Sequence, residues 1–412
     1  MAPGSRLLAV AAAVGMGCRA WENLGGLGWQ RNSQPPPWKA HTGSLAVTLP
    51  SNGRVLLIAG QAGEHGGALF DCFNCTKEVW SFDSADEKWE DLSAVVPWAP
   101  RWGHSAVVTS DDTVWMLFGC CEPGMPTVML RDVWTYNPTK GTPWTLMKTE
   151  PPFEGIQATS VAVRGKDELW VCGGWSQSRG TLSQVAVLSL TTLAWEVKSE
   201  HGEAPWRHRA DHATALSSDG GWLFLFAGQH RDEKTGRWSR LQDTWRVALP
   251  AARASDWQQL GDLNAARSSV PVLVLPSGWL LALGGHHVPD DEELKVPQED
   301  IEGILDHHRK GAFSVYNDVL ALDLRPNSGA SSFSESVAKH STWSVVEPNA
   351  PWPARDDCAA AVGADGSLLL FGGGTIYGGG GYLHDFWRLP SAAAAYALRA
   401  PESSGAERGS DL

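Results

Sequence analysis

The sequence predicts an all-β fold built from six copies of one unit, and three observations carry this prediction. An apolar run ending in paired small residues recurs six times at a spacing of about 55 residues. The 412-residue chain contains 22 Trp but only 11 Phe and 5 Tyr, which indicates that one Trp-bearing unit has been copied. The 44 Gly and 25 Pro are spread along the whole chain, as expected for many short strands joined by turns.

The chain begins with a stretch typical of a secretory signal peptide. Arg6 precedes an apolar run from Leu7 to about Gly17, and Ala20 supplies a cleavage edge. The run is too short to span a bilayer, and no later segment reaches the roughly 18 apolar residues that a membrane helix needs. We therefore expect residues 1–20 to be removed and the protein to be secreted or to stay in the secretory lumen. The alternative is an Ala-rich N-terminal helix.

The first signature of each unit is the apolar run that ends in Gly-Gly or a near relative. The six runs are LLIAG (56–60), MLFGC (116–120), WVCGG (170–174), FLFAG (224–228), LALGG (281–285) and LLFGG (369–373). Their last residues give successive steps of 60, 54, 54, 57 and 88 residues. The large final step predicts an insertion in the fifth unit.

Further strands surround each of these runs. An acid or amide precedes the next strand, in Glu78-Val79-Trp80, Asp132-Val133-Trp134, Gln184-Val185-Ala186, Asp243-Thr244-Trp245, Asp318-Val319-Leu320 and Asp385-Phe386-Trp387. A Trp then opens a third strand, at Trp89, Trp144, Trp195, Trp257 and Trp343. Another apolar strand precedes each Gly run, as in HSAVV (104–108). Alternation of apolar and polar residues, with no long helical period, predicts four β-strands in every unit.

The sixth unit lacks its final Trp strand, because an Ala-rich segment (391–395) and a polar tail follow Leu389. The missing strand is expected at the other end, where Trp29-Gln30-Arg31 resembles Trp195-Glu196-Val197. An N-terminal strand that completes the last sheet would leave no open sheet edge. The prediction is a six-bladed β-propeller over residues 21–390, with an insertion at 286–313 and a tail at 391–412.

Gly-Gly, then Asp-Val-Trp, then Trp, at this spacing resembles the kelch motif over roughly residues 29–390. Copy three departs with Gln184-Val185-Ala186, and copies one and four have Ala-Gly in place of Gly-Gly. The resemblance implies a kelch-repeat propeller, a scaffold used by adaptors, lectin-like binders and several enzymes. It also implies that the ligand commonly lies on the face formed by the loops after Gly-Gly and the loops that enter the first strands.

That loop face is rich in Arg, His and Trp, which suit a ligand bearing a carboxylate or a sugar. The candidate ligand-binding residues are Arg101, His104, Arg209, His212, Arg267, Arg355, Trp175, His65, Gln229 and Tyr377. The alternative is that the arginines pair with neighbouring Asp residues and hold the blades together.

The leading functional interpretation is a monomeric, non-catalytic module that binds a protein or a glycan and needs no cofactor. The alternative is a carbohydrate-active enzyme of the epimerase or mutarotase kind that acts on an anionic sugar. A formal charge of −13 argues against a nucleic-acid partner.

Four cysteines, Cys72, Cys75, Cys120 and Cys121, fall in corresponding loops of the first two units. Behind a signal peptide they are expected to form disulfides, with thiols or a four-thiolate zinc site as alternatives. The insertion holds eight acids and two His-His pairs. Since His307 and His308 are adjacent and cannot point the same way from a helix, no metal site is predicted there.

Overall fold

The structure is a computed structural model that describes most of the chain between Trp21 and Ser391. The described residues are 21–23, 27–63, 75–120, 129–153, 156, 160–165, 167–250, 253–287, 314–324, 342–375 and 381–391. The predicted signal peptide, most of the insertion and nearly all of the tail lie outside them. Within the described residues, no helix has the length and apolar character needed to cross a membrane.

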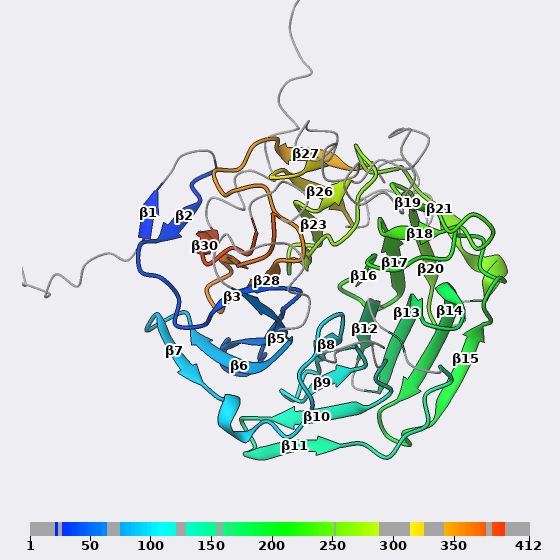
Figure 1. Cartoon of the computed structure of the whole chain (residues 1–412), viewed down its shortest axis with the longest axis horizontal. Helices are drawn as coiled ribbons and strands as arrows, with labels where there is room; N and C mark the ends of the chain where they lie inside the picture. Colours follow the sequence, from blue (N-terminus) through cyan, green and yellow to red (C-terminus); the bar gives the residue numbers. More distant parts are fainter. Residues whose placement is uncertain are drawn as a thin grey trace, which may run out of the picture.

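Six antiparallel sheets of four or five strands surround a central axis (Figure 1). Blade 1 contains β4 (Leu45–Thr48), β5 (Val55–Gly63), β6 (Cys75–Asp83) and β7 (Lys88–Asp91), with β3 (Ala40–Thr42) beside β5. Blade 2 contains β8 (Ser105–Val108), β9 (Val114–Leu117), β10 (Val133–Asn137) and β11 (Thr142–Leu146). Blade 3 contains β12 (Ser160–Arg164), β13 (Glu168–Ser176), β14 (Gly180–Ser189) and β15 (Trp195–Ser199).

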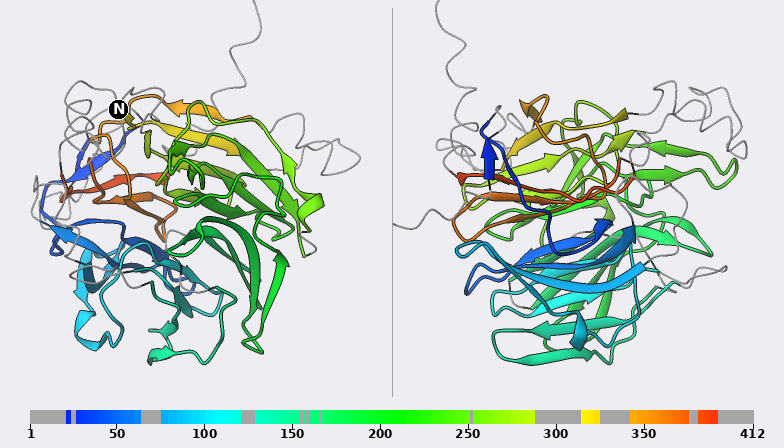
Figure 2. Two further views of the ribbon diagram at one scale, coloured as in Figure 1. Left: turned by 45° about the vertical axis from the view of Figure 1, so that its right-hand side comes forward. Right: turned by 60° about the vertical axis from the view of Figure 1, so that its left-hand side comes forward.

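The remaining blades repeat this order, and the turned views in Figure 2 show the sheets following one another around the ring. Blade 4 contains β16 (Ala213–Leu216), β17 (Trp222–Phe226), β20 (Thr244–Ala248) and β21 (Gln258–Gln259). Blade 5 contains β22 (Val272–Val274), β23 (Trp279–Leu283), β26 (Val319–Asp323) and β27 (Ser344–Glu347). Blade 6 contains β28 (Ala359–Val362), β29 (Leu368–Phe371), β30 (Phe386–Leu389), β2 (Gln30–Asn32) and β1 (Trp21–Asn23). The predicted six-bladed propeller is confirmed.

Smaller elements complete the structure outside the six large sheets. Two short hairpins are β18 (Gln229–Arg231) with β19 (Trp238–Arg240), and β24 (His286–His287) with β25 (Ser314–Val315). Two single turns of 3-10 helix are η1 (Ser93–Val95) and η2 (Ala254–Asp256).

The N-terminal segment closes the ring as predicted. Strand β2 pairs with β30 through Gln30 opposite Arg388 and Arg31 opposite Trp387. The neighbouring Trp29 is 0% exposed, and its indole N–H donates to Glu347 Oε2 of blade 5 at 2.8 Å. Strands β1 and β2 therefore form the outer part of the last blade.

The hydrophobic core is divided among the borders between blades. Within the described residues, the buried apolar side chains form six clusters, each shared by two neighbouring sheets. Trp29 belongs to the cluster between blades 5 and 6, and Trp38 to the cluster between blades 6 and 1. Because each sheet is covered on both faces, the inner strands are apolar on both sides, which explains their continuous apolar runs.

The paired small residues adopt one backbone geometry in all six blades. The first residue of each pair has φ between 51° and 62°, and the second is always Gly, with φ between 91° and 109°. In blade 2 this pair is Phe118-Gly119. The apolar run of blade 2 therefore ends at Gly119, one residue before the predicted end at Cys120. The first position tolerates Ala or Phe, because a φ near 60° is accessible to L-residues at moderate cost. The second lies beyond that region and requires Gly.

The cysteine prediction needs a correction at Cys120, which is buried and carries a thiol rather than a disulfide. Burial raises the pKa of this thiol to about 12. Cys75 is disulfide-bonded, and Cys72 and Cys121 lie outside the described residues. Cys75 Sγ is 3.9 Å from the carbonyl oxygen of Cys120, so these two residues of blades 1 and 2 are neighbours.

Candidate functional site

The four predicted ligand-binding arginines are completely buried inside the blades. Arg101, Arg209, Arg267 and Arg355 are each 0% exposed. Each makes paired hydrogen bonds of 2.7–3.0 Å with an Asp of its own blade, namely Asp132, Asp243, Asp318 and Asp385. Each also donates at 2.7–2.9 Å to the carbonyl of the first residue of the small pair. A buried guanidinium is tolerated when its donors are paired in this way.

Tryptophans complete this ion pair and explain part of the Trp bias. Arg209 lies over the ring of Trp206 at 5.7 Å, and Trp98 and Trp352 take the same place beside their arginines. On the other side, the indole N–H of Trp245 donates to Asp243 Oδ2 at 2.6 Å. A Trp-x-x-Arg segment and an Asp-x-Trp segment are thus joined through charge and ring contacts.

Blades 1 and 3 vary this arrangement. In blade 1, His41 takes the place of Arg, lies 3.5 Å from Glu78 and stacks on Trp38 at 5.7 Å. In blade 3, Ile156 takes that place, and Gln184 replaces the Asp. The departure of copy three therefore follows from the loss of both charged partners in the same blade.

The pairing of Arg with Asp matches the alternative that the sequence left open. Since the guanidinium donors are occupied within the blades, the four arginines are not placed to meet a ligand from solvent. The observable geometry favours a stabilising role, and ligand binding by these residues stays a prediction. The pKa of Asp243 is lower than the usual value for a carboxyl. Burial alone would raise it, but the hydrogen bonds and charge of Arg209 outweigh burial.

His104 and His212 occupy equivalent buried positions beside the central axis, with exposed fractions of 5% and 8%. Burial and the charge of the neighbouring Arg lower the pKa of each imidazole to about 3, so both are neutral at physiological pH. Both line the central cavity described next.

A cavity of about 300 Å³ occupies the centre of the ring. Its walls come from the inner strands and the residues just before them, which include 43–46, 103–106, 211–214, 269–272 and 357–360. Small apolar side chains in these segments are interspersed with polar ones, among them Ser44, His104 and His212. The acids among the lining residues are Asp211 and Asp357.

The acids sit at a rim of residues with positive φ, formed by Gly43, Gly103, Asp211, Ser269 and Asp357. Backbone hydrogen bonds connect this rim around part of the axis: Ser269 N–H donates to Asp211 at 2.9 Å, and Asp357 N–H to Ser269 at 3.3 Å. Gly43 N–H continues the chain by donating to Asp357 at 2.8 Å. The rim therefore places two aspartates, both partly exposed, on the cavity.

A third acid, Asp356, lies behind the rim and is 1% exposed. Its Oδ2 is 2.9 Å from His286 Nδ1, and His286 Nε2 is 3.3 Å from Arg240. Burial raises the pKa of Asp356 to about 7 and that of Asp211 to about 6. Burial and the charges of Asp356 and Asp211 raise the pKa of Asp357 well above its usual range. Asp356 and Asp211 can therefore exchange protons near neutral pH.

A second cavity, of about 450 Å³, opens between blades 3 and 4. We call it the Trp175 groove; its lining is Trp175, Gln177, Ser178, Arg179, Gly180, His201, Arg231 and Glu233. The long β13–β14 hairpin supplies one wall and the β18–β19 hairpin the other, and the loop after β15 supplies His201.

Aromatic and cationic groups face this groove. Trp175 and Trp238 are both partly exposed and pack at 5.3 Å between ring centroids. The guanidinium of Arg231 lies 5.7 Å from the Trp175 ring, and Arg231 and Arg179 are exposed. In contrast to the buried arginines, these two can form hydrogen bonds with a ligand that enters from solvent.

The remaining predicted site residues are dispersed. Trp175 lies in its groove, whereas Gln229 donates from its amide to Asp211 at the rim. His65 and Tyr377 lie outside the described residues. The prediction missed Arg179, Arg231 and Glu233, because they lie at hairpin turns whose length differs from blade to blade. The buried ion pairs could have been predicted from a sequence pattern, because a Trp stands three residues before the Arg at Trp98, Trp206 and Trp352.

The fold and the repeated signatures define a kelch-type β-propeller. The family described as the Attractin/LZTR1 beta-propeller matches residues 64–294, more than half of the chain, and the protein belongs to this family.

Similar proteins agree with this assignment. Kelch-like protein 25 of Xenopus tropicalis is 27% identical over 232 residues, which are 53% of this chain and 33% of that protein. The Homo sapiens protein of the same name is 26% identical over 242 residues, 57% of this chain and 35% of its own length. This chain thus spans about a third of these relatives. A solved structure described as "Structure of YjhT" superposes with a TM-score of 0.59 at 15% identity, covering 85% of this chain and 95% of the other.

Proposed function

We propose that this propeller is a non-catalytic module that binds a partner protein through the Trp175 groove, by recognising an acidic segment of that partner. The observation that carries the proposal is the pairing of the partly exposed Trp175 ring with two exposed arginines in one cavity. Aromatic and Arg side chains are enriched where proteins bind one another. Because the relatives are longer proteins with this region as one part, their whole activities are not transferred to this chain.

Electrostatics supports an acidic partner at this place. The chain has a formal charge of −13, so a groove with Arg179 and Arg231 is a local exception to the overall charge. A guanidinium binds a carboxylate through two parallel hydrogen bonds, and the aromatic ring beneath Arg231 limits its motion. The groove volume of about 450 Å³ suits a few side chains rather than a whole folded domain.

The test uses labelled peptides of equal length that carry Glu and Asp, the matching Gln and Asn, or Lys. We expect the acidic set to bind best, and Trp175→Ala or Arg231→Ala to weaken that binding on the order of 10-fold or more. Arg207→Ala is the matched control, because Arg207 is exposed on the loop between blades 3 and 4 but outside the groove lining. Equal binding of all three sets, or equal binding by all variants, would contradict the proposal. A parallel glycan array distinguishes a sugar ligand from a protein ligand.

A second candidate function rests on the carboxyls at the central cavity. Asp211 and Asp357 line it, and burial raises the pKa of both, as acid–base chemistry near neutral pH requires. This supports an epimerase or mutarotase acting on an anionic sugar. Anomer exchange of a sugar acid followed by NMR tests it: an enzyme would exceed the buffer rate and lose that excess in Asp357→Asn. A rate equal to buffer removes this candidate.

We also propose secretion, because residues 1–20 have the order of a signal peptide. Expression in a secreting cell should deliver protein to the medium with its N-terminus near Trp21. Intracellular protein that retains Met1 would contradict this proposal.

A further inference from the structure

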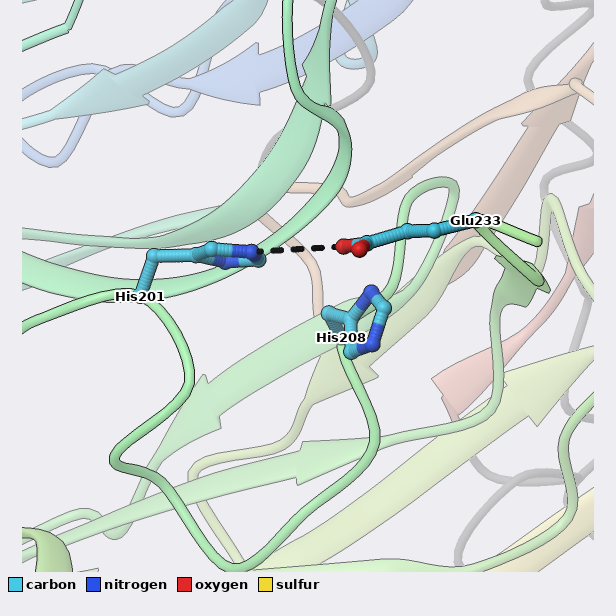
Figure 3. A group of neighbouring side chains, drawn as sticks. All are labelled: His201, His208 and Glu233. Carbon is cyan, nitrogen blue, oxygen red and sulfur yellow. Dashed lines mark ion pairs between the residues drawn. The ribbon is translucent and has the colours of Figure 1, made fainter.

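Two histidines and a glutamate converge at the edge of the Trp175 groove (Figure 3). His201 Nε2 lies 3.8 Å from Glu233 Oε1, and one ligand atom from each of His201, His208 and Glu233 lies within 4.8 Å of the others. The rings of His201 and His208 are nearly perpendicular, at 81°, with centroids 5.4 Å apart. Within the described residues, this is the one group of three or more His, Cys, Asp or Glu side chains close enough to hold a metal ion.

We propose that His201, His208 and Glu233 bind a divalent transition-metal ion, with zinc as the best match. Two imidazoles and one carboxylate are ligands that zinc accepts, and three protein ligands leave a fourth position for water or for a ligand group. Calcium and magnesium are a poor match, because they prefer sites made of oxygen atoms. This inference goes beyond the proposed function, since peptide binding by Trp175 and Arg231 requires no metal.

The surroundings hold the two rings in place. The Ser183 amide donates to His201 Nδ1 at 3.2 Å, and Thr181 Oγ1 lies 3.2 Å from His208 Nδ1. His230 packs edge-on against His208 at 4.4 Å between centroids. The Thr181 contact is of the kind that orients a metal-binding histidine, because the hydroxyl oxygen can accept from Nδ1–H of His208 and leave Nε2 for the metal. For His201 Nε2 to coordinate, its ring proton must move to Nδ1, so the Ser183 contact is the one that has to be released.

The third ligand can close the site. Glu233 lies in the turn of the β18–β19 hairpin, and its side chain is 62% exposed. The turn itself is fixed, because Asp232 Oδ1 accepts from the amides of Lys234 at 3.0 Å and Thr235 at 2.7 Å. With metal–ligand distances of about 2.0–2.2 Å, tetrahedral ligand atoms lie roughly 3.3–3.6 Å apart. A change of Glu233 rotamer can shorten the distances from its carboxylate to the two rings, because the side chain is exposed. The separation of the two histidines changes only if the rings themselves move.

The experiment titrates the tag-free full chain with Zn²⁺ by calorimetry and with Co²⁺ by its visible absorption. We expect one tight equivalent per chain and a tetrahedral cobalt spectrum. His201→Ala, His208→Ala and Glu233→Gln should each weaken binding at least 10-fold. Glu203→Gln, a change at an exposed acid in the loop that carries His201 and His208, is the matched control and should bind as wild type.

Two further variants separate the possible outcomes. His307→Ala with His308→Ala removes a His pair of the insertion and should leave the tight equivalent intact. Glu233→Gln changes an exposed side chain, so its loss of binding cannot be assigned to unfolding. No tight zinc equivalent in the wild type would overturn the inference. So would a His201→Ala, His208→Ala double variant that melts normally and keeps wild-type affinity.

Discussion

The backbone amide of Gly373 in blade 6 donates a hydrogen bond of 2.8 Å to the carbonyl of His41 in blade 1. The same bond recurs at every border: the Gly at the second position of each pair donates to the residue at the Arg position of the next blade. The other pairs are Gly60 with Arg101, Gly119 with Ile156, Gly174 with Arg209, Gly228 with Arg267 and Gly285 with Arg355. The ring is therefore closed by backbone contacts as well as by β2.

Removal of residues 21–40 should reduce stability sharply. The deletion takes away β2, which pairs with β30, and the buried side chains of Trp29 and Trp38. Losing a large buried aromatic side chain typically costs about 3–5 kcal/mol. Thermal melting of this variant is compared with the chain that begins at Trp21. Equal melting temperatures would show that the N-terminal strand does not close the ring.

Arg209→Met should destabilise the protein by about 2–4 kcal/mol, because it removes a fully buried charge partner from Asp243, whose side chain is only 20% exposed. Lys140→Met is the matched control: Lys140 pairs with Asp111 at 2.6 Å, but both side chains are about half exposed, at 58% and 45%. An exposed pair of this kind contributes about 0–1 kcal/mol. Urea unfolding measures both, and similar small losses would contradict a stabilising role of the buried pair.

Gly228→Ala should be far more damaging than Gly141→Ala, although both glycines have positive φ. A Cβ on Gly228 would lie 2.6 Å from His212 Cβ and 2.8 Å from the Ala210 carbonyl oxygen, whereas a Cβ on Gly141 meets nothing within 4 Å. We expect about 1–2 kcal/mol for Gly141→Ala from backbone strain alone. Gly228→Ala adds overpacking of about 1–3 kcal/mol. Equal unfolding free energies would disprove the close packing at the blade border.

Relative to the Asp356→Asn variant, the wild type should lose stability as pH rises from about 5 to 8. The comparison with this variant is needed because His104 and His212, whose pKa values are lowered to about 3, make stability rise over part of the same range. Burial raises the pKa of Asp356 to about 7, so this carboxyl is neutral in the folded protein at pH 5 and must ionise without adequate solvation at pH 8. A group whose folded pKa is raised contributes stability at low pH and loses it as pH passes through the folded pKa. Asp356→Asn should therefore remove this loss and add about 2–4 kcal/mol at pH 8 relative to the wild type.

The matched control for this pH profile is Asp86→Asn, because the Asp86 side chain is 64% exposed. It should follow the wild-type profile. At low pH, stability depends on Asp132, Asp243 and Asp385. Their arginines lower the pKa values of these carboxyls despite burial, so the ionised carboxyls stabilise the folded protein. That contribution is lost in acid, below the ordinary carboxyl pKa of about 4. A difference in stability between the wild type and Asp356→Asn that stays constant from pH 5 to 8 would contradict the raised pKa of Asp356.

The fold could be predicted because its signals repeat. A φ near 100° demands Gly at the second position of each pair, so the sequence shows the same residue at Gly60, Gly174 and Gly373. Closure at Trp29 was also visible, since the missing strand of the sixth unit had a counterpart at the N-terminus. Phe118 shows the limit of this approach, because a φ of 62° accepts a large side chain and hides the register.

The site was harder to predict than the fold. The sequence shows which residues lie on the loop face, but not whether their side chains are buried within a blade or exposed to solvent. Arg209 and Arg231 are both arginines of blade 4, yet the first is 0% exposed and paired with Asp243, and the second is exposed beside Trp175. The Trp-x-x-Arg spacing marks the first kind. Nothing comparable marks the second, because the β18–β19 hairpin has its own length and lies outside the repeat.

The most direct test of the Trp175 groove as the binding site is site-specific photocrosslinking to an acidic peptide. A photoreactive residue is placed at Gln177, which is exposed in the groove lining, or at Leu146, which is 52% exposed on the outer strand of blade 2. We predict that the peptide crosslinks from position 177 and not from position 146, and that Arg231→Ala abolishes the crosslink. Equal crosslinking from both positions, or none from position 177 while the peptide remains bound, would contradict the account.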